Sequence, residues 1–425
     1  MDGFIGGETA LPGSLVTDVQ VARLVSRTCP QEAYRGRRIL LIIPDGTRTA
    51  PIGLMFKTLF SQLGGITRAF DILIALGTHP PMSEEAICDR LEIGIEERRT
   101  TFASVQFFNH EWDNPAALKP LGVLAADEIR ELSGGRFAMD VPVAVNRRVF
   151  DYDEVIIVGP VFPHEVVGMS GGNKYLFPGV GGPDILNFFH WLGAVVTNAA
   201  IIGNARTPVR AVVDRAGALV KVPKKCFALV AKGDGAVGIF AGTPEAAWER
   251  AAEMSAQHHI VWKDRDYHTI LSCAAPMYDE LWVGAKAMYK LEPVLADGGE
   301  LIIFAPHLKQ VSVVHGQLIR EVGYHCRDYF LKQWDRFRHL PWGTLAHCTH
   351  VFGSGTYENG VETPRARVTL ATGIPEAVCR EINLGYRDWR ALRPEAFANR
   401  EDEGVLLVPK AGEQLYRKRE SPKPM

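Results

Sequence analysis

A glycine-rich segment holds the densest group of side chains that could do chemistry in this sequence. Residues 168–182 (GMSGGNKYLFPGVGG) surround a single lysine, Lys174, with His164 before the segment and His190 after it. Glycine lets the backbone approach a ligand closely, and successive backbone N–H groups can hold an anion. A lysine in such a loop can bind phosphate or act as a nucleophile, and histidine can carry a proton or bind a metal. Since these groups stand within one short stretch, a functional interpretation is favoured over a purely structural one.

Two shorter motifs follow apolar runs that are predicted to be strands. Asp45, Thr47 and Arg48 come directly after RILLIIP, and they offer an acceptor, a hydroxyl and a bidentate donor suited to phosphate or carboxylate. His79 follows DILIALG in the sequence GTHP. A turn leading into the next helix explains His79 as well as a direct role does.

Three other motifs carry less weight. His110 lies in NHEWD, where a lone histidine is usually an exposed loop residue, so its functional claim depends on the other motifs. The sequence HCTH at 347–350 looks like a metal cluster, but such tight spacing without a partner pair is usually coincidental. The sequence GDGAVG at 233–238 matches GxGxxG, yet the helix signal comes later, at Thr243-Pro244. A hairpin with GDG as its turn is therefore predicted instead of a dinucleotide site.

Short apolar runs alternate with amphipathic stretches, which is typical of an α/β protein with largely parallel sheets. In such sheets ligands bind outside the carboxyl ends of the strands, which is where the motifs above are found. The predicted strands are 38–44, 71–77, 154–159, 268–271, 300–305 and 404–409, and the predicted helices are 52–63, 184–192, 244–258, 278–295 and 310–322.

The length of 425 residues suits two packed domains. A long helix ends in a charged turn near 263–267, so the boundary is predicted there. We expect a cofactor-binding α/β domain over 1–265, which residues 404–425 could rejoin, and a second α/β domain over 266–403. The charged end, RKRESPKPM, is predicted to be disordered.

Composition excludes several classes of protein. Apolar residues make up 47% of the chain and charged residues 23%, with a net charge of -2 and no basic blocks, which argues against nucleic-acid binding. Seven scattered cysteines without a CxxC pair indicate a reducing compartment and no zinc ribbon. Neither a signal peptide nor an apolar run long enough to span a bilayer is visible. A cytoplasmic protein without a membrane partner is expected.

Taken in order, these motifs resemble the nickel-dependent lactate racemase family, whose members racemise or epimerise 2-hydroxyacids. The resemblance runs from about Leu40 to Pro306, and the order of the pieces is specific although no single piece is. The matching pieces are Asp45-x-Thr47-Arg48, Gly77-Thr78-His79, His110, His164, Gly171-Gly172-Asn173-Lys174, His190 and Lys286.

The resemblance implies two α/β domains with the active site in the cleft between them. It also implies a nickel-pincer nucleotide, a pyridinium mononucleotide that holds nickel through one carbon and two sulfur atoms. By position in the motif, Lys174 would attach the cofactor through a thioamide and His190 would complete the square-planar nickel. Soft sulfur donors with one imidazole suit square-planar Ni(II).

The same resemblance assigns roles to the other motif residues. His110 and His164 would be the two acid/base residues, while Arg48 and Lys286 would face the substrate carboxylate. The hydrogen on C2 of a 2-hydroxycarboxylate is barely acidic, so it would leave as hydride while a histidine takes the hydroxyl proton, and a 2-oxoacid would form. The residues expected to help hold the cofactor or its phosphate are Asp45, Thr47, His79, Gly171 and Gly172.

The substrate is left open by a departure from the family pattern. Lactate racemase has Tyr and Gln just before the helix lysine, whereas this chain has Trp282-Val283-Gly284-Ala285 before Lys286, so the resemblance implies that Trp282 would lie beside the substrate. Lactate, malate, a longer acid and a sugar acid all stay open. The expected partners are a small 2-hydroxyacid and the proteins that make the cofactor. The alternatives are a nicotinamide-dependent 2-hydroxyacid oxidoreductase and a non-catalytic protein that binds a phosphorylated ligand.

Overall fold

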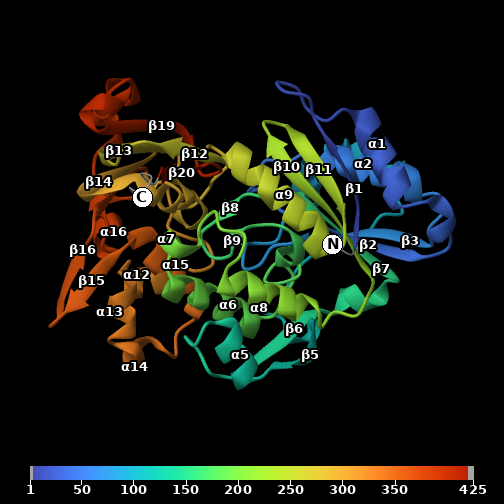
Figure 1. Ribbon diagram of the computed structural model, residues 1–425, viewed down its shortest axis with the longest axis horizontal. Coiled ribbons are helices and arrows are strands. Elements are labelled where there is room, and N and C mark those ends of the chain that lie inside the picture. The colour runs from blue at the N-terminus through green and yellow to red at the C-terminus, as the bar shows by residue number, and fades with distance from the viewer. Residues whose placement is uncertain (1–2, 420–425) are drawn as a thin grey trace, which may run out of the picture. The chain divides into compact units, whose positions relative to one another are not determined.

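The computed structural model describes residues 3–419, and the chain divides into two compact units (Figure 1). The first unit comprises the described residues up to 162 together with 169–186 and 205–258. The second comprises 163–168, 187–204 and the described residues from 259 onward. Two short segments from the first half of the sequence, which carry His164 and His190, therefore group with the second unit. The single boundary predicted near 263–267 would have placed both segments in the first domain.

The first unit is built on a seven-stranded sheet with the order β1-β11-β10-β7-β2-β3-β4 (Figure 1). Neighbours from β10 to β4 run parallel, whereas β11 is antiparallel to both β1 and β10. Parallel strands that are covered on both faces need continuous apolar runs, and RILLIIP is such a run. The strands are β1 (Phe4–Thr9), β2 (Arg38–Pro44), β3 (Ala69–Ala75), β4 (Phe107–Asn109), β7 (Glu154–Pro160), β10 (Lys224–Lys232) and β11 (Gly235–Gly242).

Helices α1 and α2 bury one apolar stripe each against this sheet. The stripe of α1 includes Val21 and Leu24, and that of α2 includes Phe56 and Leu59, all in one core cluster with the strand residues. Besides α6, which is described below, the helices that start in this unit are α1 (Asp18–Thr28), α2 (Ile52–Leu63), α3 (Glu84–Arg90), α4 (Ile95–Arg99), α5 (Ala126–Leu132), α8 (Pro208–Gly217) and α9 (Pro244–His259). The small pair β5 (Leu118–Leu124) and β6 (Val141–Asn146) completes the unit.

The second unit is built on a five-stranded parallel sheet with the order β18-β17-β14-β13-β19. Its strands are β13 (Tyr267–Ala274), β14 (Leu295–Ala305), β17 (Arg367–Thr372), β18 (Gly385–Tyr386) and β19 (Val405–Ala411). The smaller strands are β8 (Pro163–His164), β9 (Gly168–Met169), β12 (Ile260–Lys263), β15 (Gly355–Glu358), β16 (Val361–Pro364) and β20 (Leu415–Lys418).

The helices of the second unit are short, apart from α6 and α15. Helix α6 begins in the first unit and continues into the second, where most of its length lies. The helices are α6 (Pro183–Val196), α7 (Asn198–Ile201), α10 (Leu281–Gly284), α11 (Lys286–Tyr289), α12 (Gly316–Val322), α13 (Arg327–Leu331), α14 (Trp334–Phe337), α15 (Trp342–Phe352) and α16 (Glu376–Glu381). Among the described residues no helix is long and apolar enough to cross a bilayer.

Several sequence predictions are confirmed. The strand 38–44 and the helix 52–63 occur with the predicted bounds, as β2 and α2. Strands β10 and β11 form the predicted antiparallel hairpin, and the next helix begins at Pro244. The GDGAVG stretch is therefore a turn and a strand, and it does not open a helix as a dinucleotide-binding motif must.

Two helix predictions are wrong in extent. The helix predicted over 278–295 is interrupted at Ala285 into α10 and α11, and its last part is the 3-10 turn Glu292–Val294, where Pro293 lacks the N–H that a continuous helix needs. The helix predicted over 310–322 shortens to α12, because the carbonyls of Gln310 and Val311 accept hydrogen bonds from residues 281 and 282 instead.

The end of the described chain differs from the prediction as well. Strand β19 pairs in parallel with β13, so residues 405–411 belong to the second sheet and do not rejoin the first. Strand β20 pairs with β12, so the start of the charged segment predicted to be disordered is an ordered strand. Residues 420–425 lie outside the described part of the chain.

Candidate functional site

Three of the predicted site residues follow three neighbouring parallel strands of the first unit. Asp45 follows β2, His79 comes shortly after β3, and His110 follows β4. The backbone N–H of His110 donates to the carbonyl of Ile74 on β3 at 3.3 Å. The carboxyl ends of parallel strands meet at one edge of a sheet, so these side chains lie along the edge where ligands of α/β proteins bind.

Asp45 organises the turn that carries Thr47 and Arg48. Its Oδ1 accepts hydrogen bonds from the backbone N–H of Thr47 at 3.1 Å and from the Thr47 hydroxyl at 2.7 Å. Its Oδ2 lies 2.5 Å from Nδ1 of His79. Asp45 is buried, whereas Thr47, Arg48 and His79 are half-buried. The carboxylate therefore positions the turn and the imidazole, and the turn presents Arg48 as a cationic group that water can reach.

His110 is held in one tautomer by two hydrogen bonds within the first unit. Its Nε2 lies 3.0 Å from the carbonyl of Gly181 and therefore donates, while Nδ1 accepts from the side-chain amide of Asn146 at 3.2 Å. Burial lowers the pKa of His110 to about 4. The ring is therefore neutral at pH 7, as a general base must be.

The buried His110 should make stability depend on pH below neutrality. The folded pKa of about 4 lies below the unfolded value near 6.5, so the unfolded chain binds the extra proton. Stability is then fully present above pH 6.5 and falls towards pH 4, by up to about 3 kcal/mol from this residue. In His110→Gln, urea unfolding between pH 4 and 6.5 should show a correspondingly smaller loss. Equal pH slopes in the two proteins would contradict the assignment.

The glycine loop approaches its neighbours too closely for any side chain at Gly171. Gly171 has φ +91°, and a Cβ there would lie 2.6 Å from Cγ2 of Val161. Gly172 has φ +60°, and its Cβ would lie 2.9 Å from Cβ of Trp248. The indole N–H of Trp248 also donates to the carbonyl of Ser170 at 2.8 Å. The backbone of the loop therefore packs directly against the side chains of Val161 and Trp248, which fixes its position.

Two buried polar residues hold the loop from within the first unit. Arg210 donates to the carbonyl of Gly171 at 3.2 Å and stacks on Trp248, with 4.0 Å between its guanidinium carbon and the ring centre. The side-chain amide of Asn173 donates to Asp214 at 3.1 Å and to Glu245 at 2.6 Å. Lys174, the next residue, is half-buried. The loop thus presents its lysine from a rigid backbone.

Replacing Gly171 with alanine should destabilise the protein by about 3 kcal/mol, because backbone strain and overpacking add at one position. Gly233→Ala is the matched control. Gly233 also has a positive φ, +55°, but no atom would lie within 4 Å of a Cβ added there, so only the strain cost of about 1 kcal/mol applies. Urea unfolding of both variants measures the difference. A Gly171→Ala variant as stable as Gly233→Ala would show that the loop adapts.

In the second unit, buried His164 has two kinds of neighbour at the same ring nitrogen. Its Nδ1 accepts from the backbone N–H of Val166 at 3.1 Å and lies 3.4 Å from Oε2 of Glu165. The backbone donor uses the Nδ1 lone pair, so the proton of the neutral ring lies on Nε2, whereas the carboxylate would pair with Nδ1 once the ring is protonated. A partner for each protonation state therefore stands beside a residue that must accept a proton and return it.

Trp282 packs against two imidazole rings of the second unit. The ring of His347 stacks on it at 4.0 Å between centroids and 15° between planes, and the ring of His315 lies at 4.2 Å and 31°. Nε2 of His347 lies 3.0 Å from the backbone carbonyl of Trp282 and donates to it. Because Nε2 carries the proton, Nδ1 of His347 is an acceptor. This acceptor has no hydrogen-bond partner among residues 3–419.

Lys286 and His190 belong to the same unit as this stack. Lys286 comes four residues after Trp282 on consecutive helical turns, and only 6% of it is exposed. Its Nζ lies 5.0 Å from the centre of the Tyr278 ring. His190 is half-buried on α6. Burial first, and then neighbouring histidines that include His190, lower the pKa of His347 to about 3.

Comparisons with known proteins decide the family. Residues 22–203 match the family model of the lactate racemase N-terminal domain. A crystal structure of a Thermotoga maritima protein is 31% identical, with a TM-score of 0.88 over 96% of this chain and 100% of that chain. The chain belongs to the lactate racemase family. The lactate racemase apoprotein from Thermoanaerobacterium thermosaccharolyticum has the same fold, with 16% identity and a TM-score of 0.68 over 96% of this chain and 95% of that chain. No curated protein matches.

Membership of the lactate racemase family confirms the resemblance and the mixed α/β fold with mainly parallel sheets. It favours racemisation or epimerisation of a hydroxyacid, and the family is known for a nickel cofactor. The structure distributes the predicted residues over both units. Those in the first unit are Asp45, Thr47, Arg48, His79, His110, Gly171, Gly172 and Lys174, and those in the second are His164, His190, Trp282 and Lys286.

Sequence reasoning missed His315 and undervalued His347. The first histidine of HCTH packs on Trp282 and lies near His190, a position that only the lactate racemase fold reveals. One signal was available: residues 347 and 350 are three apart in an apolar stretch, a spacing that puts both histidines on one face of a helix.

Proposed function

We propose that this protein racemises or epimerises a 2-hydroxycarboxylic acid at C2. The observation that carries the proposal is the environment of His164, whose Nδ1 faces both a backbone donor and the Glu165 carboxylate. A racemase needs each acid/base residue to take a proton in one direction and return it in the other. His110 supplies the second imidazole, neutral at pH 7.

The residues fit a cofactor that brings most of its own metal donors. Within residues 3–419 no group of three or more His, Cys, Asp or Glu side chains is arranged to hold a metal ion. His190 would then supply one imidazole to the nickel of a nickel-pincer nucleotide, and Lys174 would attach or bind the organic part. The close-packed Gly171–Gly172 backbone and the Asp45–Thr47–His79 turn would hold its phosphate end. When bound, such a cofactor supplies a hydride acceptor.

The remaining residues would bind the substrate and move its hydroxyl proton. Arg48 and Lys286 are the cations available for the carboxylate, and the Trp282 stack would form the wall beside C3. One histidine takes the hydroxyl proton as the C2 hydrogen leaves as hydride, which yields a planar 2-oxoacid. When hydride returns to the opposite face, the other histidine, in its protonated form, returns a proton to the oxygen, and the configuration at C2 is inverted. The first histidine then releases its proton to water and the second takes one up, which restores the starting state.

The test is a panel of optically pure 2-hydroxyacids incubated with protein that was co-produced with cofactor-making enzymes. Loss of optical purity is expected for at least one acid in the panel. With substrate deuterated at C2, the product should keep the label, because hydride is not exchanged with water. Inversion accompanied by loss of the label to water would contradict hydride transfer and favour a carbanion mechanism.

The alternatives from the sequence have less support. A nicotinamide-dependent oxidoreductase would need a dinucleotide motif, and GDGAVG is a hairpin turn and strand. A binding protein for a phosphorylated ligand would keep its affinity after both His110 and His164 are replaced and would never invert a substrate.

A further inference from the structure

Arg90 is a cationic residue of the first unit to which neither the sequence motifs nor the proposed reaction gives a role. Its side chain is half-buried, and its Nε and Nη2 are buried atoms without a hydrogen-bond partner within residues 3–419. Its Nη1 makes no hydrogen bond or ion pair in that part of the chain either, and it keeps contact with solvent. A guanidinium carries five N–H donors, which are normally used when the group is buried. A ligand can reach these donors through Nη1.

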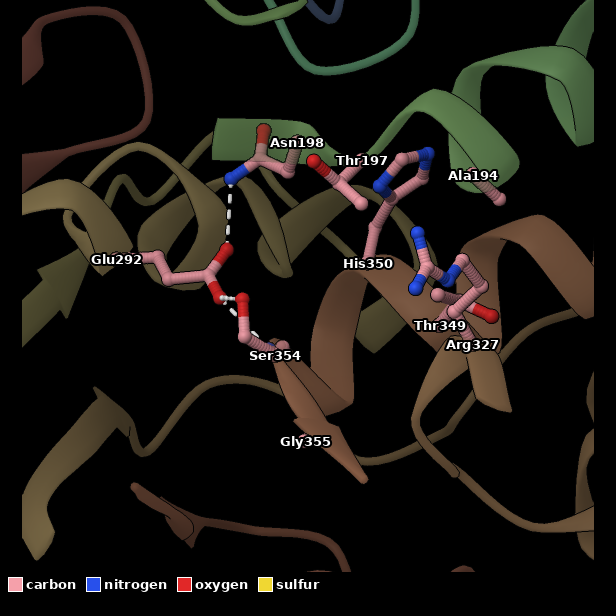
Figure 2. Close-up of a pocket in the computed structure, with 10 residues that line it drawn as sticks. Ala194, Thr197, Asn198, Glu292, Arg327, Thr349, His350, Ser354 and Gly355 are labelled. Carbon is pink, nitrogen blue, oxygen red and sulfur yellow. Dashed lines mark hydrogen bonds between the residues drawn. The ribbon is translucent and has the colours of Figure 1, made fainter. Parts of the chain in front are cut away.

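A buried charge in the second unit shows how such groups are usually paired. The carboxylate of Glu292 accepts from the amide of Asn198 at 2.8 Å, and from the backbone N–H and hydroxyl of Ser354 at 2.7 and 2.8 Å, beside a cavity of about 110 Å³ (Figure 2). Arg365 offsets its charge at 3.9 Å. A charged group removed from water without such partners destabilises the fold. A suitable anion at Arg90 would remove that cost.

The end of α3 holds Arg90 beside the turn over residues 45–49. Arg90 is the last residue of α3, and Leu91, which follows it, is fully buried. A Cβ at Gly53, in the first turn of α2, would lie 2.7 Å from the carbonyl oxygen of Leu91 and 2.6 Å from Cδ of Glu92. The residues that follow Arg90 therefore pack directly against the start of the helix into which the turn over 45–49 leads.

Electrostatic effects place Arg90 and Arg48 near one point. Burial lowers the pKa of Arg90, and the Asp45 carboxylate opposes that effect. Burial also raises the pKa of Tyr175, and Arg48 and Arg90 both oppose it. The Tyr175 hydroxyl donates to the carbonyl of Pro160 at 3.3 Å. Interactions between charges weaken with distance, so both guanidinium groups lie in the neighbourhood of this hydroxyl.

The anion that best fits this arrangement is a phosphate monoester. It carries about two negative charges at neutral pH and three acceptor oxygens, and guanidinium groups bind it through pairs of parallel hydrogen bonds. A single substrate carboxylate would already be paired with Arg48 in the proposed function. Asp45 is itself negative, so the turn over 45–49 needs a further cation before it can hold a dianion. Arg90 is that cation.

We propose that Arg90 binds the phosphate group of a pyridinium mononucleotide beside the turn over residues 45–49. This role of Arg90 rests on the proposed function, which takes the cofactor to be such a nucleotide. The turn would then position the phosphate, while the unused donors of Arg90 would offset its charge.

The test is isothermal titration of the full-length protein, produced without cofactor-making enzymes, with two ligands. Nicotinamide mononucleotide is a pyridinium mononucleotide, and nicotinamide riboside is the same molecule without the phosphate. Saturable binding of the mononucleotide is expected, with the riboside at least about tenfold weaker, because the riboside has no group for Arg90. Absence of mononucleotide binding, or equal affinity for the two ligands, would overturn the proposal.

Two variants assign the difference to Arg90. Arg90→Met keeps an apolar side chain of similar length and removes the charge, so it should weaken mononucleotide binding at least about tenfold and leave riboside binding unchanged. Arg99→Met is the matched control, because Arg99 is an exposed cation on α4 of the same unit, and it should bind both ligands as the unmodified protein does. An equal loss for both ligands in Arg90→Met, or mononucleotide affinity equal to that of the control, would contradict the assignment.

Thermal unfolding without ligand separates this role from a structural one. Arg90→Met removes an unpaired charge, so its Tm should equal or exceed that of the unmodified protein. A lower Tm would show that Arg90 stabilises the fold through its own contacts, and the proposal would be wrong.

The proposed function and the role of Arg90 can fail separately. Phosphate-dependent binding that is lost in Arg90→Met would support this role even if no acid in the panel were racemised. Racemisation by the unmodified protein, together with unchanged mononucleotide binding in Arg90→Met, would exclude Arg90 and leave the proposed function standing.

Discussion

Alanine at position 164 should lower the rate of racemisation by about 10²–10⁴-fold, the usual contribution of a general acid or base. The same loss is expected for His110→Ala. Each histidine serves one enantiomer in the proposed mechanism, so removing either one interrupts the path from one configuration to the other. The rate is measured by polarimetry or chiral chromatography with the acid identified in the panel. Because both histidines are buried, replacing them can destabilise the protein. Circular dichroism of each variant therefore serves to establish that it is folded.

His258→Ala is the matched control, because His258 is exposed at the end of α9 and has no assigned role. It should keep the full rate. If His110→Ala and His164→Ala both racemised at the rate of the His258 variant, the mechanism with two bases would be wrong. If only one were inactive, a mechanism with a single acid/base residue would replace it.

The second large effect concerns nickel. In protein co-produced with cofactor-making enzymes, His190→Ala should reduce bound nickel by at least about tenfold. Replacing a residue that merely orients a metal ligand already costs about 10–100-fold in affinity, and His190 is assigned as a ligand itself. Metal analysis of the purified protein measures the ratio of nickel to chain.

His164→Ala provides the contrast, because it should lose activity and keep its nickel. The pair separates metal binding from proton transfer within the same unit. Equal nickel in His190→Ala and the unmodified protein would remove His190 from the metal site. His347, the neighbouring imidazole whose Nδ1 has no partner among residues 3–419, would then be the next ligand to test.

The parts of the fold that were predicted correctly are those set by local sequence. RILLIIP is an uninterrupted apolar run that ends in proline, and IGLMFKTLFSQL has the spacing of a helix with one buried face, so β2 and α2 appear with the expected bounds. The grouping of Asp45 and His79 also follows from sequence, since each comes after a predicted strand of one parallel sheet, whereas the short strand β4 before His110 was not predicted.

The predictions that failed concern features that depend on contacts between distant segments of the chain. Residues 310 and 311 leave the predicted helix because they pair with 281 and 282. His347 gains its place from Trp282, 65 positions earlier in the chain. His164 and His190 were expected in the first domain, and only the packing of 163–168 and 187–204 assigns them to the second unit. Periodicity along the chain carries no information about such pairings.

The strand order of the second sheet has a consequence for how the chain folds as it is synthesised. All seven strands of the first sheet are complete by Gly242, so that sheet can form while the ribosome is still translating the remainder. In the second sheet, the outer neighbour of β13 is β19, which begins only at Val405. Until then, one edge of β13 has unpaired backbone groups, so a nascent or truncated chain that lacks β19 would be open to aggregation through that edge.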